Sequence, residues 1–369
     1  MTRICALVVV SLAGSAFAQT PGDIIFTSQQ GNGVRMIGGF APTPAGTATQ
    51  LWNSANPATR LHNITSAPDG NYYVADGRFP FPNTTDAGII RLSNLFTGAT
   101  ASQLQQGNPI QNPVGLVWDN NTNRLYTVSN PGSPQLATTI DGVFGVDLAG
   151  NVNTVFTETF PIPPRPAYHA AHSIIKDPRP GSNDYLISNL NGGVGTDPNP
   201  IFGFDAESST IWRMRWNGAS YAVDSTPMID FDSSFTGASG SFYNARGMAA
   251  VPGSSSIYVA DIDAGAINRV DMDALGNFAS ITTIVTGLAQ PETIIYNPYS
   301  NKLVFSERST SGGGPLVGSK ISEINLDGTG YRVMYDGEHA QGFAIVPTPG
   351  AATVLGLAGL LAVRRRRAR

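Results

Sequence analysis

The chain has 369 residues, of which 13% are charged, and it contains 41 glycines and 26 prolines. Glycine and proline together stay below the share expected of disordered low-complexity sequence, so we expect a folded, turn-rich protein. Six of the 22 basic residues lie at the two ends, which leaves 16 basic against 26 acidic residues in the middle. This acidic middle excludes a nucleic-acid partner and disfavours anionic membrane surfaces.

Residues 1–18 have the three parts of a secretory signal peptide. Arg3 gives a basic start, an apolar run covers residues 4–13, and the small-residue triplet Ala16-Phe17-Ala18 provides a cleavage site. The only cysteine, Cys5, lies in this segment, so the remaining chain can form neither a disulfide nor a cysteine-based zinc site. We predict recognition by the export machinery and cleavage after Ala18.

Residues 19–346 carry a repeated pattern of an apolar first strand, a tight turn, a second strand rich in Tyr, Val and Ile, and a further hairpin. Five copies have first strands at residues 63–66, 115–118, 173–176, 247–250 and 293–296, and a sixth first strand spans 342–346. The intervals are 52, 58, 74, 46 and 49 residues, as expected for four-stranded propeller blades with insertions. We therefore predict an all-β fold, a single six-bladed β-propeller.

The two ends of this region complement each other. Residues 342–346 form a first strand with nothing after it, whereas residues 23–28, 34–38 and 47–52 form three strands with no first strand before them. We expect 342–346 to pair with 23–28, because this pairing removes two free sheet edges. The propeller is thus predicted to be closed by its N- and C-terminal strands.

The last complete blade resembles a known repeat. Val304-Phe305-Ser306-Glu307 stands where the YWTD repeat of low-density lipoprotein receptors has Tyr-Trp-Thr-Asp, and residues 257–261 and 267–271 repeat the theme. The chain is also similar to NHL and gluconolactonase-type propellers, and the resemblance covers most of residues 24–346. It implies the propeller fold, but it does not choose among the receptors, scaffolds, lactonases and lyases that share this fold.

Long connections gather on one predicted face of the ring. Strands of a blade run antiparallel from the axis outward, so second-to-third and fourth-to-first connections share one face. All six long segments are of these two kinds: residues 77–87, 131–141, 158–171, 192–209, 232–244 and 308–318. Long loops on a rigid scaffold often bind or catalyse, so we expect a ligand there, with Phe202, Phe242 or Tyr243 at its rim.

Polar residues near the strand ends on this face are the candidate ligand-binding residues. First strands begin and second strands end there, close to the axis, so their side chains are expected around the mouth of the channel. These residues are His62, Asp76, His172, Asn189, Arg246, Asp261, Glu292 and Glu307. We place Arg246, Asp261, Glu292 and Glu307 at the centre. Glu292 and Glu307 are expected to lie close enough to need a cation, a proton or a ligand, and a purely structural ring of salt bridges is the alternative.

A divalent metal ion such as calcium at this mouth stays open. The resemblance to gluconolactonases implies three or four hard ligands, and Asp76, Asn189, Asp261, Glu292 and Glu307 carry suitable donor groups. They do not reproduce that family's ligand order, and acids at strand ends also cap turns, so we assign neither a metal site nor a cofactor. The sequence has no nucleophile-elbow or phosphate-binding motif, so no catalytic residue is assigned. The four tryptophans are expected in the blade cores.

Residues 347–369 have the three-part order of a sorting tail. Pro347-Thr348-Pro349 is followed by an apolar stretch over residues 350–363 and by Arg364, Arg365, Arg366 and Arg367. The tail resembles the PEP-CTERM sorting signal of bacteria, with Pro-Thr-Pro in place of Pro-Glu-Pro. The resemblance implies transient membrane anchoring and processing by an exosortase-like transpeptidase.

These observations favour an exported module of the bacterial cell envelope, cell surface or extracellular matrix that binds a polysaccharide or a surface protein. The alternative is a metal-dependent, lactonase-like hydrolase with its site at the channel mouth. A purely structural envelope component is a third hypothesis.

Overall fold

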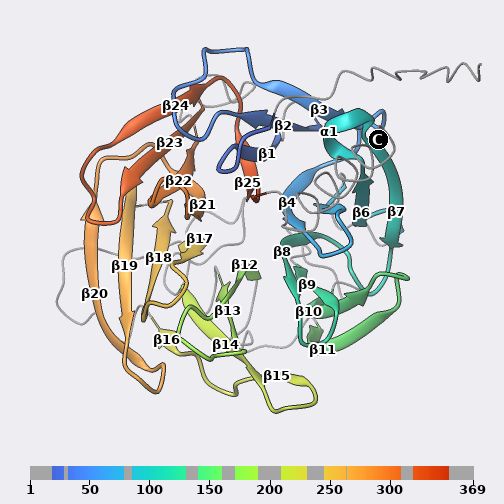
Figure 1. Cartoon of the computed structure of the whole chain (residues 1–369). Helices are drawn as coiled ribbons and strands as arrows, with labels where there is room; N and C mark the ends of the chain where they lie inside the picture. Colours follow the sequence, from blue (N-terminus) through green and yellow to red (C-terminus); the bar gives the residue numbers. More distant parts are fainter. Residues whose placement is uncertain are drawn as a thin grey trace, which may run out of the picture.

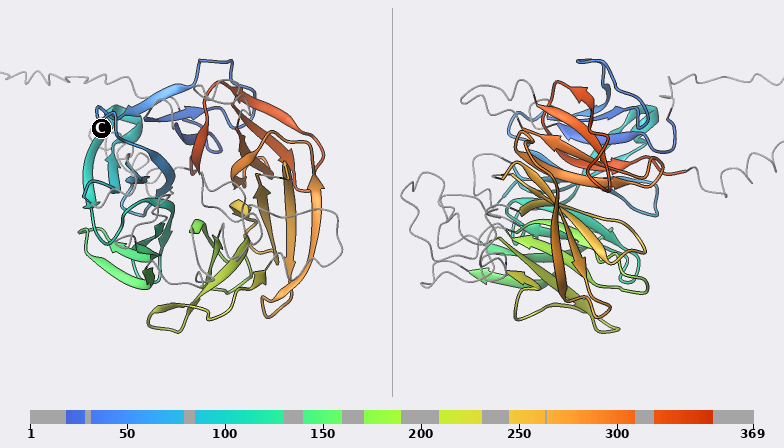
Figure 2. Two further views of the ribbon diagram at one scale, coloured as in Figure 1. Left: turned by 180° about the vertical axis from the view of Figure 1, so that it is seen from behind. Right: turned by 90° about the vertical axis from the view of Figure 1, so that its left-hand side faces the viewer.

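The computed structural model of the chain describes residues 19–28, 32–78, 85–129, 140–159, 171–189, 209–230, 245–262, 264–308 and 319–348. In this part, the strands form six antiparallel sheets that stand like blades around a central axis (Figure 1). The view from behind shows the same ring, and the view from the side shows the blades edge-on (Figure 2). The predicted fold class, a single six-bladed β-propeller, is confirmed. The predicted signal peptide and most of the predicted tail lie outside the described residues.

The blades are numbered along the chain, and the strands of each are given from the axis outward. Blade 1 consists of β4 (Leu61–Ser66), β5 (Tyr72–Asp76), β6 (Gly88–Ser93) and β7 (Thr100–Gln106), with the short helix α1 (Leu95–Gly98) before β7. Blade 2 consists of β8 (Pro113–Asp119), β9 (Arg124–Ser129), β10 (Ile140–Asp147) and β11 (Val152–Thr159). Blade 3 consists of β12 (Ala171–Lys176), β13 (Tyr185–Asn189), β14 (Thr210–Trp216) and two short outer strands, β15 (Tyr221–Val223) and β16 (Ile229–Asp230).

Blade 4 consists of β17 (Ala245–Ala250), β18 (Ser256–Asp261), β19 (Ala266–Met272) and β20 (Phe278–Val285). Blade 5 consists of β21 (Pro291–Asn297), β22 (Lys302–Glu307), β23 (Lys320–Asn325) and β24 (Arg332–Asp336). Blade 6 consists of β25 (Ala340–Ile345), β1 (Ile24–Ser28), β2 (Gly33–Ile37) and β3 (Thr49–Asn53).

The hydrophobic core lies between neighbouring blades. Strands rich in Val, Ile and Tyr direct alternate side chains to the two faces of each blade, and each face meets the next blade. Ile25 and Val34 of blade 6, for example, share one buried cluster with Ile64 and Val74 of blade 1. Because every blade is sandwiched in this way, the ring is rigid enough to hold residues at the axis in fixed positions.

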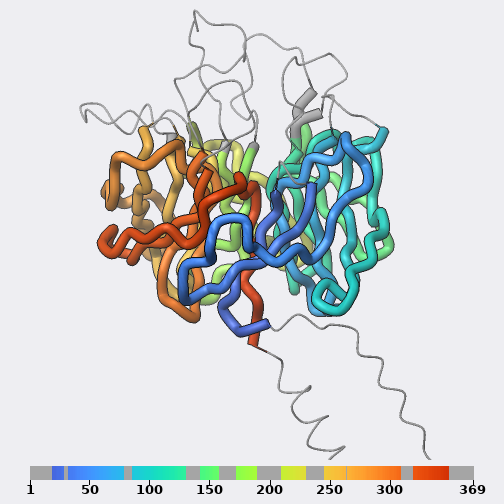
Figure 3. The backbone as a smooth tube through the Cα atoms, turned by 90° about the horizontal axis from the view of Figure 1, so that it is seen from above, coloured from blue at the N-terminus to red at the C-terminus, as the bar shows by residue number. Residues whose placement is uncertain are grey.

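The chain ends close the ring as predicted. Strand β25 pairs antiparallel with β1 from Ile24 opposite Ile345 to Thr27 opposite Gly342. Just beyond the strands, the Val346 amide donates to the Asp23 carbonyl at 2.8 Å and the Gly22 amide donates to the Val346 carbonyl at 2.9 Å. The described ends of the chain therefore leave the ring side by side (Figure 3).

Each innermost strand begins two residues earlier than the sequence pattern predicted. The cause is a β-bulge at the same place in all six blades, where the register of the innermost strand against its neighbour shifts. A bulge inserts an extra residue and interrupts the alternation of side chains. A prediction based on two-residue alternation therefore misses the strand residues that precede the bulge.

The two faces of the ring differ in their connections. We call the face where innermost strands begin and second strands end the loop face, and the opposite face the turn face. The six long segments connect β5 to β6, β9 to β10, β11 to β12, β13 to β14, β16 to β17 and β22 to β23, so all leave from the loop face as predicted. The turn face carries the short turns and the described chain ends. No helix among the described residues is long and apolar enough to cross a membrane.

Candidate functional site at the loop-face end of the axis

The bulges place six equivalent residues around the loop-face end of the axis. A bulge re-aims a side chain that a regular strand would direct along the sheet face. The residues at this position, in order around the ring, are His62, Val114, His172, Arg246, Glu292 and Gln341. Five of the six are polar. Their electrostatic interactions cross from blade to blade, because Glu292 and Arg246 both affect the pKa of His62. We call this set the axial ring.

Glu292 is the centre of a buried network. Its Oε1 accepts a hydrogen bond from Nη1 of Arg246 at 2.5 Å, and its Oε2 lies 2.7 Å from Nε2 of His339. The Gln341 amide donates to Glu292 Oε2 at 3.3 Å and contacts Nδ1 of His339 at 2.9 Å. The His339 tautomer with its proton on Nε2 satisfies both of its contacts. The side chains of Glu292 and His339 are 4% and 1% exposed, and that of Arg246 is 18% exposed.

Glu292 is ionised in this network. Burial alone would raise the pKa of its carboxyl group, but His339 and Arg246 outweigh burial and hold that pKa well below its usual value. A buried carboxylate is stable only where partners replace lost water, and Arg246 and His339 do so here. The site therefore contains a fixed negative charge beside a fixed positive one.

His62 and His172 are neutral at physiological pH. Burial lowers the pKa of His62 to about 4, despite opposing effects of Gln341 and Glu292. Burial, aided by Arg246, lowers the pKa of His172 to about 3, although Glu292 opposes this. A neutral imidazole offers one hydrogen-bond donor and one acceptor. The axial ring thus combines an ion pair with two groups that can both donate and accept.

The other predicted carboxylates do not join this ring. Asp76 Oδ2 lies 2.6 Å from Nε of Arg78, and its Oδ1 accepts from the Arg60 amide at 3.1 Å. Asp261 accepts from the Ala264 amide at 3.1 Å. These residues sit on regular strand ends, where their side chains cap adjoining loops rather than turn to the axis.

Glu307 and Glu292 have separate partners in the described structure. Glu307 Oε1 accepts from the hydroxyls of Ser322 at 2.6 Å and Tyr331 at 2.7 Å, and its Oε2 accepts from the Ala289 amide at 3.1 Å. These partners belong to its own blade. The physical reason is the bulge, which turns Glu292 to the axis but leaves Glu307 on the face of its blade.

Several of the predicted site residues lie wholly or partly outside the described residues. Asn189 ends β13, but its side chain is outside the described part, as are Phe202, Phe242 and Tyr243 entirely. Of the predicted sorting motif, Pro347 and Thr348 are described, and Pro349 and Arg364 to Arg367 are not. The Thr348 amide donates to the Tyr299 hydroxyl at 2.6 Å, on the turn face.

His339 was missed by sequence reasoning. It precedes β25, two residues before the ring position of Gln341, and nothing in the strand pattern distinguishes it. Histidine content was the available signal, because the chain has only four histidines, of which His62 and His172 belong to the axial ring and His339 contacts it.

The donor groups expected for a calcium ion are dispersed. Among the described residues, no group of three or more His, Cys, Asp or Glu side chains is arranged to hold a metal ion. Asp76, Asp261 and Glu307 already bind the backbone and side chains of their own loops. The geometry of the described part gives the metal-site alternative no support.

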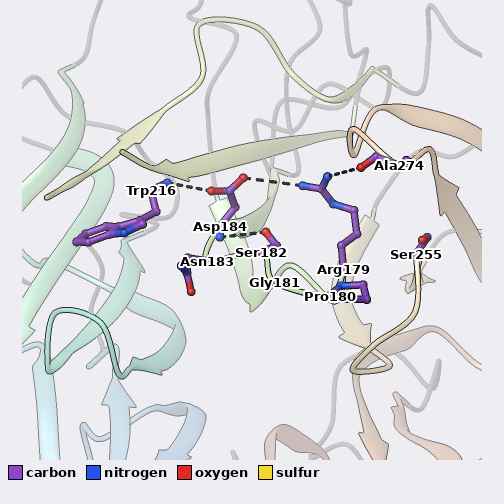
Figure 4. Close-up of a pocket in the computed structure, with 9 residues that line it drawn as sticks. All are labelled: Arg179, Pro180, Gly181, Ser182, Asn183, Asp184, Trp216, Ser255 and Ala274. Carbon is purple, nitrogen blue, oxygen red and sulfur yellow. Dashed lines mark hydrogen bonds and ion pairs between the residues drawn. The ribbon is translucent and has the colours of Figure 1, made fainter. Parts of the chain in front are cut away.

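Below the axial ring, the axis becomes apolar. A cavity of about 410 Å³ opens there between the innermost strands, with Ile64, Ile174, Ile294 and Phe343 among its lining residues. Two further cavities lie on the turn face between blades 3 and 4, with volumes of about 550 and 450 Å³. Trp216 lines the larger one (Figure 4) and also packs against the core cluster of blades 2 and 3, and Trp212 is buried, as expected of both.

The class of protein is therefore a six-bladed β-propeller with a polar axial ring. No protein-family model and no curated protein sequence matches the chain. Among solved structures, a chain described as "Crystal structure of Nidogen/Laminin Complex" is similar, with a TM-score of 0.58, over 87% of this chain and 97% of that chain. The two sequences are 11% identical, so the likeness shows the propeller fold alone.

Proposed function

We propose that this propeller is a binding module that takes its ligand at the loop-face end of the axis. The observation that carries the proposal is the axial ring, in which a structural device repeated in every blade directs polar side chains to one point. Asp76, Asp261 and Glu307 bind groups near their own strand ends, whereas neither ring nitrogen of His62 has a hydrogen-bond partner among the described residues. Convergent polar groups of this kind are typical of ligand recognition.

The chemistry of the axial ring suits a polar group on a carbohydrate or protein ligand. Arg246 and Glu292 provide fixed charges, and the neutral imidazoles of His62 and His172 provide directional hydrogen bonds. The similar solved structure is described as a complex of nidogen with laminin, which is compatible with a binding role for this fold. The lactonase-like alternative has less support, because Asp76, Asp261 and Glu307 bind groups near their own strand ends and Glu292 binds Arg246 and His339.

We also propose that the protein is exported to the bacterial cell surface or matrix. The signal-peptide pattern of residues 1–18 and the sorting-tail pattern of residues 347–369 support this location. In this proposal an exosortase-like transpeptidase processes the tail after transient anchoring in the membrane.

A binding assay with a double variant of the axial ring tests the proposed function. Residues 19–348 are immobilised and probed with the extracellular polysaccharide fraction and, separately, with the surface-protein fraction of a producing bacterium. We expect one fraction to bind, and His62→Gln with His172→Gln to weaken that binding at least tenfold. Asp327→Asn, in an exposed turn on the opposite face, is the control and should bind normally. Unchanged binding by the double variant, or no binding of either fraction, would overturn the proposal.

A further inference from the structure

Blade 3 carries an unusual connection on the turn face. The other described turns between first and second strands span four or five residues, at 67–71, 120–123, 251–255 and 298–301. The corresponding connection of blade 3 covers the eight residues 177–184. We call it the blade-3 arm. It lines both turn-face cavities, those of about 550 and 450 Å³.

The arm is fixed in place by buried charge. Asp177 is fully buried and accepts hydrogen bonds from the guanidinium of Arg179, the shorter at 2.7 Å, while Nε of the buried Arg213 lies 3.7 Å away. The Asp177 amide donates to the Asp184 carbonyl at 2.9 Å, which joins the two ends of the arm. Arg179 also donates to the Ala274 carbonyl at 3.3 Å in blade 4. A connection held this firmly is preorganised for binding.

The larger cavity combines an aromatic side chain with neutral hydrogen-bonding groups (Figure 4). Trp216 is half-buried, and Tyr221 supports its indole at a centroid distance of 4.8 Å. Asp184 Oδ1 accepts from the backbone amide of Trp216 at 2.9 Å, which links the arm to the end of β14. Within the described part of the chain, neither the Asn183 amide nor the Ser255 hydroxyl makes a hydrogen bond to protein, so both are available to a ligand.

We propose that this cavity, defined as the Trp216 site, binds a neutral pyranose sugar. The apolar C–H face of a pyranose ring packs on an indole, while its hydroxyls need donors and acceptors such as Asn183, Asp184 and Ser255. Charge favours a neutral ligand, because Arg179 is engaged by Asp177 and the carboxylate of Asp184 lies 3.9 Å from Arg179. The volume of about 550 Å³ is within the usual range for small-molecule sites, and the adjoining cavity leaves room for a second sugar unit.

The Trp216 site is separate from the proposed function of the axial ring. It lies on the opposite face and uses residues of blades 3 and 4 only. A bound glycan there would tether the propeller by its turn face and leave the axial ring open. Substitution of His62 and His172 should therefore not affect sugar binding, and the two proposals can fail independently.

The test is an array of neutral oligosaccharides, including glucans, mannans and galactans, probed with residues 19–348. We expect at least one to bind, and titration of it to change the tryptophan fluorescence. Trp216→Ala and, separately, Asn183→Ala should each weaken binding at least tenfold. Trp118→Phe, on the turn face of blade 2, is the matched control and should bind as the parent protein does.

Asn183→Ala keeps the test decisive if loss of Trp216 disturbs the fold, because Asn183 is partly exposed and its side chain makes no hydrogen bond within the described part of the chain. Melting curves of all variants identify such a disturbance. Failure of every neutral oligosaccharide to bind, or binding that survives Asn183→Ala and a folded Trp216→Ala, would overturn the proposal. Binding of acidic sugars alone would also overturn it.

Discussion

A buried carboxyl group is stable only where partners replace the water that it has lost, and Glu292 and Glu307 have different kinds of partner. Glu307 is surrounded by two hydroxyls and a backbone amide of its own blade. Glu292 depends on Arg246 and His339, which belong to two other blades. Removal of charge should therefore have different consequences at the two positions.

We expect Glu292→Gln to destabilise the protein by about 2–4 kcal/mol, because it leaves a partly buried arginine without its counter-ion. Glu307→Gln should cost about 1 kcal/mol, since the amide oxygen can still accept from the hydroxyls. Urea unfolding of both variants measures the difference. Equal destabilisation would show that the axial ion pair contributes no more than an ordinary cap.

The two neutral histidines make stability depend on pH. Their pKa values, about 4 for His62 and about 3 for His172, lie below the value of 6.5 expected in the unfolded chain. Between these limits the unfolded state binds more protons, so stability falls as the pH is lowered from about 6.5 towards 4. Each histidine should cost about 2 kcal/mol at pH 5 relative to pH 8.

Unfolding free energies at pH 5, 6, 7 and 8 measure this dependence. The variant with His62→Gln and His172→Gln should lose most of the slope between pH 5 and 6.5. Glu292 does not interfere, because its low pKa preserves its own contribution throughout this range. An unchanged slope in the double variant would contradict the assignment of both histidines as neutral.

At the scale of elements, the residue directly after each axial-ring position alternates around the axis between glycine and a larger residue. Directly after the axial ring, β8, β17 and β25 have Gly115, Gly247 and Gly342, whereas β4, β12 and β21 have Asn63, Ser173 and Thr293. A Cβ atom on each glycine would meet the backbone of the next innermost strand, at 3.0 Å from Ile174 N, 2.6 Å from Glu292 O and 2.5 Å from Asn63 Cα respectively. At these three glycines the backbones of neighbouring innermost strands therefore lie close together.

Gly247→Ala should destabilise the protein by about 1–3 kcal/mol, because the added methyl group meets backbone that cannot rotate away. It should also displace Glu292, whose carbonyl oxygen is the atom that it touches. Ser173→Ala, at the equivalent position of an alternate strand, is the control and should cost less than about 1 kcal/mol. Equal melting temperatures for the two variants would contradict a close backbone contact at Gly247.

The sequence pattern predicted the number of blades, the six innermost strands and the closure, because these follow from spacing and hydrophobic alternation. It placed His62, His172, Arg246 and Glu292 near the axis because they precede the expected first strands. It could not tell which way a strand-end side chain points, so it added Asp76, Asp261 and Glu307 to the same cluster. Direction depends on the bulges, which have no signature in a single sequence.

At the scale of the whole molecule, stability should depend on β25. A chain ending at Gln341 lacks the residues that pair with Ile24 to Thr27 and removes Phe343 and Ala344 from two buried clusters. We expect this truncation to be insoluble or to melt well below the parent protein, because β1 becomes an open edge. A soluble chain of equal heat stability would contradict closure as a source of stability.

The residues after β25 should contribute little to folding. Thr348 contacts only the exposed Tyr299 among the described residues, and Val346 already completes the junction of the two chain ends. A chain ending at Val346 should therefore melt within about 3 °C of one ending at Arg369. Calorimetry of the two proteins measures this, and a failure of the shorter chain to fold would move the domain boundary towards the C-terminus.

The pairing of β1 with β25 also constrains the order in which parts of the ring can fold. Ile24 is made long before its partner Ile345. Blades 1 to 5 are complete in sequence before β25 exists, so β1 to β3 must wait as an unfinished sheet until β25 is made. Contacts this distant in sequence form slowly, and an exposed edge during the delay invites misassembly. The ring can therefore close only after β25 has been made.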